Sequence, residues 1–249
     1  TARAPRQRCN IASLHTPVVL IVLTSVDKFP DGNPTGWYLP EAAHPYFKFR
    51  QAGFSVQWAS TKGSATCDPG SLVKFADDEE CASFWGDADL RRVTQKHAKI
   101  ADLDETAFDA ILFVGGLGSL WDFASDPGCK DFVRAMYASG KLVASVCNGG
   151  IVFKDVEVDG QHILYGKECT AFTNAEVEAV QKRHLVREPV GPGSCEDTLS
   201  EAGGVFKDGG LWEANVCIAG NVMTGQNPMS ARPLGEAIVT ALSSHACMV

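Results

Sequence analysis

Short apolar segments recur along the chain, and each stretch between them has room for one or more helices. The segments cover residues 18–24, 55–59, 110–114, 142–146 and 222–224. Between the first two, residues 39–53 place Tyr46 and Phe49 on one helical face and end at Gly53, which suits a helix C-terminus. Residues 126–140 repeat this arrangement before the segment 142–146. Successive strand–helix–strand units predict an α/β fold with a mostly parallel sheet and helices on both faces.

Composition restricts the partners and the compartment that we expect. The 249 residues include 22 Lys and Arg against 30 Asp and Glu, a net charge of −8, so a basic surface for nucleic acid is not expected. Nine cysteines, an odd number, favour reduced thiols in a cytoplasmic protein. The apolar run 17–23 is too short to cross a bilayer, so no membrane span is expected. A signal peptide is the alternative for this run, but the residues after it make a poor cleavage site.

We expect one domain over residues 1–249, because no internal repeat or low-complexity linker interrupts the sequence. Residues 1–16 are expected to form a disordered N-terminal extension. Residues 61–105 are expected to be a helical insertion at one edge of the sheet. Within it, residues 74–90 combine many acidic side chains with Phe75, Phe84 and Trp85, which favours a solvated face over a substrate site.

A cysteine stands at the end of the apolar segment 142–146, where Cys147-Asn148-Gly149-Gly150 follows. The two glycines permit a tight turn from a strand into a helix. This is the layout of a nucleophile elbow, in which the start of the helix lowers the pKa of a thiol. The alternative is that Cys147 is a small buried core residue. None of the other eight cysteines has this setting, so Cys147 is the predicted nucleophile.

A glycine-rich loop follows the apolar segment 110–114 and reads Gly115-Gly116-Leu117-Gly118. Loops at the carboxyl ends of neighbouring parallel strands converge, so we expect this loop to meet the Cys147 elbow. Gly116 would then offer a backbone N–H to a developing oxyanion. A phosphate-binding loop or a plain tight turn are the alternatives, and no Lys-Ser or Lys-Thr pair follows to support a nucleotide site.

The order of these motifs resembles the DJ-1/PfpI superfamily, and within it the Hsp31-like, glutathione-independent glyoxalase III branch. The resemblance includes the cysteine elbow, the glycine loop, and the segments 40–45, 49–54, 171–176, 189–199 and 224–228. It extends from about residue 18 to about residue 242. It implies a flavodoxin-like three-layer sandwich with a mostly parallel sheet, and a homodimer.

The resemblance also implies roles for individual residues. The family's nucleophile falls on Cys147 and its acid on Glu41, whose carboxyl can exchange a proton with a thiol or a substrate. On its own, Glu41 is equally explained as an acid favoured at a helix start. The backbone N–H groups of Gly116 and Asn148 would flank an oxyanion. Leu117 and Gly149 complete the expected substrate-binding set.

Two positions depart from the glyoxalase III pattern. Asn148 stands where that branch has a histidine after the cysteine, and Leu117 replaces the histidine of Gly-Gly-His-Gly. An amide does not titrate near neutral pH, and leucine makes the site more apolar and removes a possible metal ligand. We expect His44, which belongs to the family pattern, to be structural. Surface positions are expected for His15, His97, His162, His184 and His245, and an approach to the site is considered for Glu196 and Asp197.

The leading hypothesis is a cofactor-independent enzyme with a Cys147 nucleophile, acting on a small carbonyl or other electrophilic metabolite. It would be a glyoxalase III-like lyase or hydratase, or a hydrolase, with a more apolar substrate than methylglyoxal. No cofactor and no metal are expected, because no spacing of His, Cys, Asp and Glu matches a closed zinc or iron site. The alternative is a non-enzymatic stress protein, either a holdase chaperone or a thiol redox sensor in which Glu41 holds an oxidised Cys147.

Overall fold

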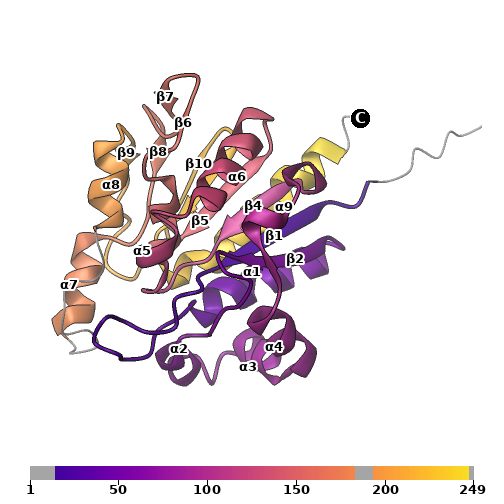
Figure 1. Ribbon diagram of the computed structural model, residues 1–249, viewed down its shortest axis with the longest axis vertical. Coiled ribbons are helices and arrows are strands. Elements are labelled where there is room, and N and C mark those ends of the chain that lie inside the picture. Colours follow the sequence, from indigo (N-terminus) through magenta and orange to yellow (C-terminus); the bar gives the residue numbers. More distant parts are fainter. Residues whose placement is uncertain (1–14, 183–192, 247–249) are drawn as a thin grey trace, which may run out of the picture.

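The computed structural model describes residues 15–182 and 193–246, and the mostly parallel sheet is confirmed (Figure 1). The main sheet has seven strands in the order β10-β11-β5-β4-β1-β2-β3, and only β10 runs antiparallel to its neighbour. The strands are β1 Val18–Leu23, β2 Ser55–Ser60, β3 Ala98–Lys99, β4 Ala110–Phe113, β5 Leu142–Val146, β10 Val216–Ala219 and β11 Val222–Gly225. Each of the five apolar segments therefore contains a strand of this sheet.

The central strands are apolar on both faces because helices cover both sides of the sheet. Residues 19–23 of β1 are fully buried, and Val19 pairs with Val56 on β2 and with Ala110 on β4. A strand buried on both faces has a continuous apolar sequence instead of alternating apolar and polar residues. The carboxyl ends of β1, β4 and β5 lie at the same edge of the sheet, so the loops after these strands meet there.

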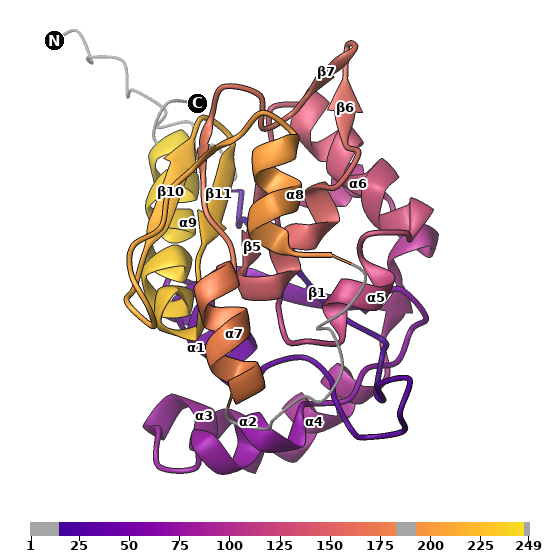
Figure 2. The same ribbon diagram turned by 90° about the vertical axis from the view of Figure 1, so that its left-hand side faces the viewer.

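Helices form the two outer layers. One layer consists of α1 (Leu39–Gln51) and α9 (Ala231–Ala246), which pack against each other. The other contains α5 (Ser119–Asp122), α6 (Pro127–Ala138), α8 (Cys195–Glu201) and the 3-10 helix η3 (Cys147–Phe153). Figure 2 shows α1 and α9 on one side of the main sheet and α5 and α6 on the other. The three layers agree with the flavodoxin-like arrangement expected from the resemblance.

Helix α1 carries the predicted acid and starts directly after Tyr38. Pro40 stands in the first turn, where its missing N–H has no intrahelical partner to lose, and Glu41 follows it. A Cβ atom on Gly235 of α9 would lie 2.9 Å from the Cα of Pro45, so α1 and α9 can cross only because this residue is glycine. This close crossing fixes α1, and with it Glu41, against the sheet.

The insertion contains three short helices grouped at one end of the molecule (Figure 2). They are α2 (Pro69–Lys74), α3 (Glu79–Gly86) and α4 (Ala88–Gln95), and an aspartate side chain caps the start of each. Phe84 of α3 is fully buried and packs edge-on against Trp37, Tyr46 and Trp58. The aromatic residues of this insertion therefore anchor it to α1 and β2.

The remaining elements flank the sheet. They are the hairpin β6 (Glu157–Val158) and β7 (Gln161–His162), the parallel pair β8 (Glu168–Cys169) and β9 (Val205–Phe206), the helix α7 (Asn174–Lys182), and the 3-10 helices η1 (Ile100–Asp102), η2 (Glu105–Ala107) and η4 (Pro228–Ser230). Among the described helices, none has the length and apolar character to cross a membrane. Residues 1–14 of the expected extension, residues 189–192 of the motif pattern, and His184 lie outside the described residues, as does the side chain of His245.

Candidate active site

Cys147 lies at the junction between β5 and η3, and the turn strain falls on the cysteine itself. Its φ is +58°, in the left-handed region that residues other than glycine rarely adopt. We expected the two following glycines to supply this turn, but neither has a positive φ. A strained reactive residue held between a buried strand and a helix is the geometry of a nucleophile elbow.

The glycines after Cys147 are needed for close packing instead. A Cβ on Gly149 would lie 2.4 Å from the carbonyl oxygen of Phe113, and one on Gly150 would lie 2.9 Å from Cβ of Ala171. Gly149 is not among the described residues that line the cavity at the site, which corrects its expected substrate-binding role. It lets η3 approach the end of β4, and so brings Cys147 to the glycine loop.

The glycine loop meets the cysteine elbow, as the order of the strands predicts. A Cβ on Gly115 would lie 2.6 Å from Oε2 of Glu41 and 2.8 Å from Cβ of Cys147, so both side chains rest against this glycine. Gly116 adopts a φ of +107°, and a Cβ there would lie 2.2 Å from the carbonyl oxygen of Gly36. Only glycine fits at either position.

Glu41 is completely buried, and neither of its carboxyl oxygens has a hydrogen bond of ordinary length and angle among the described residues. Burial raises its pKa from the usual 4.5 to about 8, although the Cys147 thiol and the Gly115 backbone lie close enough to lower it in part. The carboxyl is therefore mostly protonated at neutral pH. A buried acid with a pKa near neutrality is suited to both donating and accepting a proton.

The pKa of the Cys147 thiol is raised, which is opposite to the direction expected from the elbow alone. The largest cause is burial, and the second is the negative charge that Glu41 carries when it ionises. The backbone N–H of Asn148 lowers the pKa of Cys147, as a helix start should, but this effect is smaller. Cys147 and Glu41 thus form a buried pair in which the charge of Glu41 opposes ionisation of the thiol, whereas the thiol favours ionisation of Glu41 and burial opposes ionisation of both.

A cavity of about 330 Å³ opens above this pair. Of the predicted residues, Glu41, Gly116, Leu117, Cys147 and Asn148 line it. Its other lining residues are mostly aromatic or apolar, and they are Phe29, Pro34, Tyr38, Asp68, Gly70, Lys74, Phe172, Val180, Trp212 and Pro228. The apolar character expected from Leu117 therefore extends over most of the cavity.

The aromatic wall of the cavity was not predicted from the sequence. Trp212 packs against Phe172 with ring centroids 5.7 Å apart, and Nζ of Lys74 lies 5.3 Å from the Trp212 ring. Phe172 belongs to the segment 171–176, but no local signal distinguishes Trp212 or Lys74 as site residues. Burial and the charge of Glu41 raise the pKa of Tyr38, so its hydroxyl stays protonated and can donate to a ligand.

Glu176 holds this wall from behind, and no role was assigned to it from the sequence. It is fully buried, and its Oε1 accepts hydrogen bonds from the backbone N–H of Trp212 at 3.1 Å, from Nε2 of Gln226 at 3.2 Å and from Nδ2 of Asn227 at 2.7 Å. Oε2 accepts from the backbone N–H of Thr173 at 3.0 Å. Gln226 and Asn227 therefore help to hold the carboxylate of Glu176, which in turn positions the backbone of Trp212 at the cavity.

Asn148 is held by a second buried cysteine. Its backbone carbonyl and its side-chain oxygen lie 3.6 Å and 3.8 Å from Sγ of Cys195, which can donate to either. Glu196, next to Cys195, and Asp197 do not line the cavity. They bind Asn174 instead, through its backbone N–H and its side-chain amide, and this corrects the approach to the site considered for them.

The described histidines do not line the cavity. His44 is buried and contacts Asp78, whereas His15 is exposed and contacts Asp109. Nδ1 of His97 and Nε2 of His162 contact backbone carbonyl oxygens, and both residues are half-buried, which is less exposed than expected. No imidazole among the described residues therefore replaces the two that the glyoxalase III pattern places in the site.

The model of the DJ-1/PfpI family matches residues 38–241, which include the acid, the glycine loop and the cysteine elbow. The chain belongs to the DJ-1/PfpI family. Curated relatives within it include a glutathione-independent glyoxalase, hsp3102, of Schizosaccharomyces pombe, which is 29% identical over 86% of this chain and 92% of its own length. Glyoxalase 3 of Candida albicans is 28% identical over 91% of this chain and 99% of its own length.

Solved structures of this family agree with the fold. The Rapid Encystment Protein 24 KDa of Francisella tularensis superimposes with a TM-score of 0.84 at 30% identity, covering 91% of this chain and 99% of that one. The glyoxalase III of Candida albicans gives a TM-score of 0.77 at 25% identity, covering 90% of this chain and 97% of that one. The DJ-1/PfpI and Hsp31-like resemblance noted in the sequence is thus confirmed.

Proposed function

We propose that this protein is a glyoxalase-type enzyme that converts an α-oxoaldehyde and water into a 2-hydroxy acid without glutathione. Cys147 is the nucleophile and Glu41 moves the protons. The observation that carries the proposal is the buried contact between these two side chains at an apolar cavity. Relatives named glutathione-independent glyoxalases support the reaction class.

The first step needs Glu41 as a carboxylate, which takes the thiol proton while the sulfur attacks the aldehyde carbon. The C–S bond forms, the carbonyl π electrons move to oxygen, and Glu41 returns the proton to that oxygen, giving a hemithioacetal. In this proposal the backbone N–H groups of Gly116 and Asn148, two residues that line the cavity, stabilise the negative charge on this oxygen. A pKa of about 8 suits Glu41 to both halves of the step.

The second step moves a hydrogen between neighbouring carbons. Glu41 takes the proton from the former aldehyde carbon and gives it to the adjacent carbonyl oxygen, so an enediol forms. Glu41 then takes the proton of the hydroxyl on the sulfur-bearing carbon and gives it to the adjacent carbon. One carbon is oxidised as its neighbour is reduced, so no external oxidant is required, and the product is a 2-hydroxy thioester of Cys147. Water cleaves the C–S bond and restores the thiol. Asn148 does not titrate, so the proton transfers depend on Glu41.

The cavity favours a substrate larger than methylglyoxal. A water molecule occupies about 30 Å³, so a three-carbon oxoaldehyde fills only a minor part of the 330 Å³. Phe172 and Trp212 present ring surfaces to the remaining space, and Leu117 adds an apolar contact. We therefore propose an aromatic or branched oxoaldehyde, for which phenylglyoxal is a suitable probe.

Turnover of methylglyoxal and phenylglyoxal should be compared by measuring the 2-hydroxy acid formed. We expect a higher kcat/KM for phenylglyoxal, and losses of about 100-fold or more in Cys147→Ala and Glu41→Gln. Trp212→Ala should reduce the preference for phenylglyoxal and change methylglyoxal turnover little. Unchanged turnover in Cys147→Ala would exclude the proposed nucleophile.

The pH dependence separates this proposal from a role of Glu41 in folding alone. The attack requires ionised Glu41, so kcat/KM should rise with pH and level off above about 8. Residual activity of Glu41→Gln should lack that rise. A redox sensor, in contrast, benefits from a thiolate at neutral pH, which burial disfavours at Cys147. The enzyme is therefore the function that the site supports better.

A further inference from the structure

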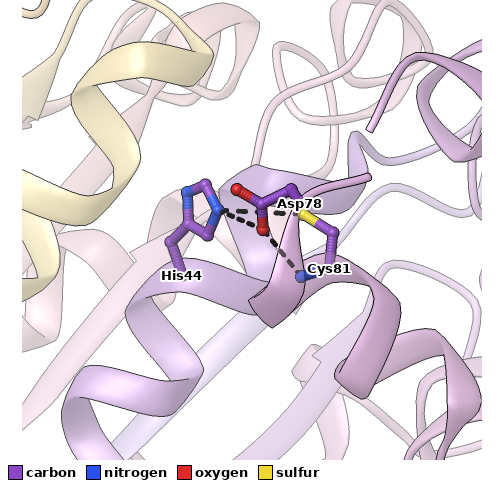
Figure 3. A group of neighbouring side chains, drawn as sticks. All are labelled: His44, Asp78 and Cys81. Atoms are coloured by element: carbon purple, nitrogen blue, oxygen red, sulfur yellow. Dashed lines mark hydrogen bonds and ion pairs between the residues drawn. The ribbon is translucent and has the colours of Figure 1, made fainter. Parts of the chain in front are cut away.

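Three side chains with metal-binding atoms converge between α1 and α3 (Figure 3), and none of them lines the catalytic cavity. His44 comes from α1, Asp78 caps the start of α3, and Cys81 lies in the first turn of α3. Nε2 of His44 is 3.1 Å from Oδ1 of Asp78 and 3.8 Å from Sγ of Cys81. All three ligand atoms lie within 4.8 Å of one another.

We propose that His44, Asp78 and Cys81 bind a zinc ion with water as the fourth ligand. Zinc–ligand bonds of about 2.0 to 2.3 Å place tetrahedral N and O ligands about 3.3 Å apart, and N and S ligands about 3.6 Å apart. The observed 3.1 Å and 3.8 Å each differ from these by a few tenths of an ångström. A small adjustment of the side chains is therefore enough to seat the ion.

The charges and donor types of the cluster also suit zinc. The two positive charges of the ion are balanced by the aspartate carboxylate and the cysteine thiolate, and the imidazole binds as a neutral ligand. When the ion binds, the thiol proton of Cys81 is released to solvent. A mixed N, O and S set favours zinc over magnesium or calcium, which prefer oxygen ligands alone. Asp78 is 28% exposed, which leaves a path for the ion and a place for the water.

The neighbouring arginine is compatible with this site. Arg232 of α9 lies 2.7 Å from Glu80 and reaches only the other oxygen of Asp78, Oδ2, at 3.9 Å. The carboxylate can thus face the ion with Oδ1 and the arginine with Oδ2. Among the described residues, no other charged group forms an ion pair with these ligands.

Helix capping alone does not account for the cluster, because the chain contains a matched case. At the start of α6, Asp126 caps the helix by accepting from the backbone N–H of Cys129 at 2.8 Å, as Asp78 does from Cys81 at 2.8 Å. Both cysteines are fully buried. Only at α3 does a histidine from another helix reach both the carboxylate and the sulfur.

The ion would add a link between two parts of the chain that are otherwise joined by packing and by the hydrogen bond from the backbone N–H of Leu39 to Oγ of Ser71. His44 follows Glu41 by three residues on α1, whereas Asp78 and Cys81 belong to the insertion. None of the three lines the catalytic cavity. The proposed role is therefore to fasten the insertion to α1, with no part in the chemistry. The sequence predicted no metal site because these ligands combine a short Asp-x-x-Cys spacing with a distant histidine.

The full chain should first be freed of metal with a chelator. One sample is then titrated with Co²⁺, whose absorption spectrum reports thiolate ligation, and a second sample is titrated with Zn²⁺ while its Tm is measured. We expect one Co²⁺ per chain with a sulfur-to-cobalt charge-transfer band, and a rise in Tm of several degrees with Zn²⁺. Cys81→Ser and His44→Gln should each weaken Zn²⁺ binding at least about 100-fold, beyond what loss of an outer hydrogen-bond partner costs.

Matched variants make the result decisive. Cys129→Ser removes the equivalent cysteine of α6 and should leave the cobalt spectrum intact, as should Cys147→Ala. Asp78→Asn keeps the helix cap but removes the charge, so this variant should fold without metal and bind Co²⁺ and Zn²⁺ weakly. It therefore tests the site even if Cys81→Ser does not fold. A band that survives His44→Gln and Asp78→Asn but disappears in Cys147→Ala would place the metal in the catalytic cavity and overturn the proposal. Absence of one-to-one binding would also overturn it.

Discussion

Glu41 and Cys147 rest against the same face of Gly115. A single methyl group on this glycine would overlap Oε2 of the acid at 2.6 Å and Cβ of the cysteine at 2.8 Å. The two groups come from different layers of the fold, one from α1 and the other from the end of β5. Their contact therefore depends on a residue with no side chain between them.

Gly115→Ala should disrupt the pair. Its Cβ would also lie 2.7 Å from the carbonyl oxygen of Val146, so neither the backbone nor the acid can stay in place. We expect turnover to fall at least about 100-fold, since displacement of reacting groups by about 1 Å has that effect. Gly86→Ala is the control, because a Cβ there meets nothing within 4 Å. Equal turnover in the two variants would contradict the close packing described here.

Glu41→Gln should stabilise the protein at neutral and alkaline pH. The folded-state pKa of about 8 lies above the ordinary 4.5, so Glu41 lowers stability as the pH rises from about 4.5 to about 8. The difference in unfolding free energy between the variant and the original chain should be small below pH 4.5 and about 4 kcal/mol at pH 8. Urea unfolding across this range measures it. A difference independent of pH would contradict the raised pKa.

Cys147 should react with iodoacetamide before the other described cysteines, because it alone among them lines the cavity. The rate should be low at pH 6 and increase into the alkaline range, because burial and Glu41 raise the thiol pKa. In Glu41→Gln the neighbouring charge is absent, so labelling at pH 8 should be faster. Peptide mass mapping after brief labelling gives both results. Fast labelling at pH 6 would show that the helix start outweighs burial.

The double variant Leu117→His with Asn148→His tests the two departures from the glyoxalase III pattern. Both residues line the cavity, and imidazoles there would titrate near neutral pH beside Cys147. We expect methylglyoxal turnover to rise and phenylglyoxal turnover to fall, because the cavity becomes more polar. Cys147→Ala provides the blank. If the original chain already turns over methylglyoxal rapidly and the double variant adds nothing, then Cys147 and Glu41 suffice without histidine.

The sheet and the elbow could be predicted because they depend on local spacing. The strand Leu142–Val146 was predicted with its observed bounds, since a continuous apolar run followed by Cys-x-Gly-Gly leaves few alternatives. Which residue carries the strained φ could not be predicted in the same way. That depends on how closely η3 approaches Phe113, and hence on contacts distant in sequence.

The electrostatics of the site could not be predicted for a related reason. The thiol pKa follows from how far water is excluded around Cys147 and from its distance to Glu41, and neither appears in a motif. No sequence motif marks Trp212 as a residue of the cavity. Its position depends on the hydrogen bond from its backbone N–H to Glu176, which lies on another segment of the chain. His44, Asp78 and Cys81 likewise meet only when α1 and α3 pack together.

The hydrogen bonds to Glu176 have a consequence for synthesis of the protein. Its donors Trp212, Gln226 and Asn227 follow it by 36, 50 and 51 positions. A nascent chain that has just released Glu176 from the ribosome has none of them, and an unpaired buried carboxylate is strongly unfavourable. The aromatic wall therefore cannot gain all of these hydrogen bonds before Asn227 has left the ribosome, and the cavity beside Cys147 cannot be completed earlier than that.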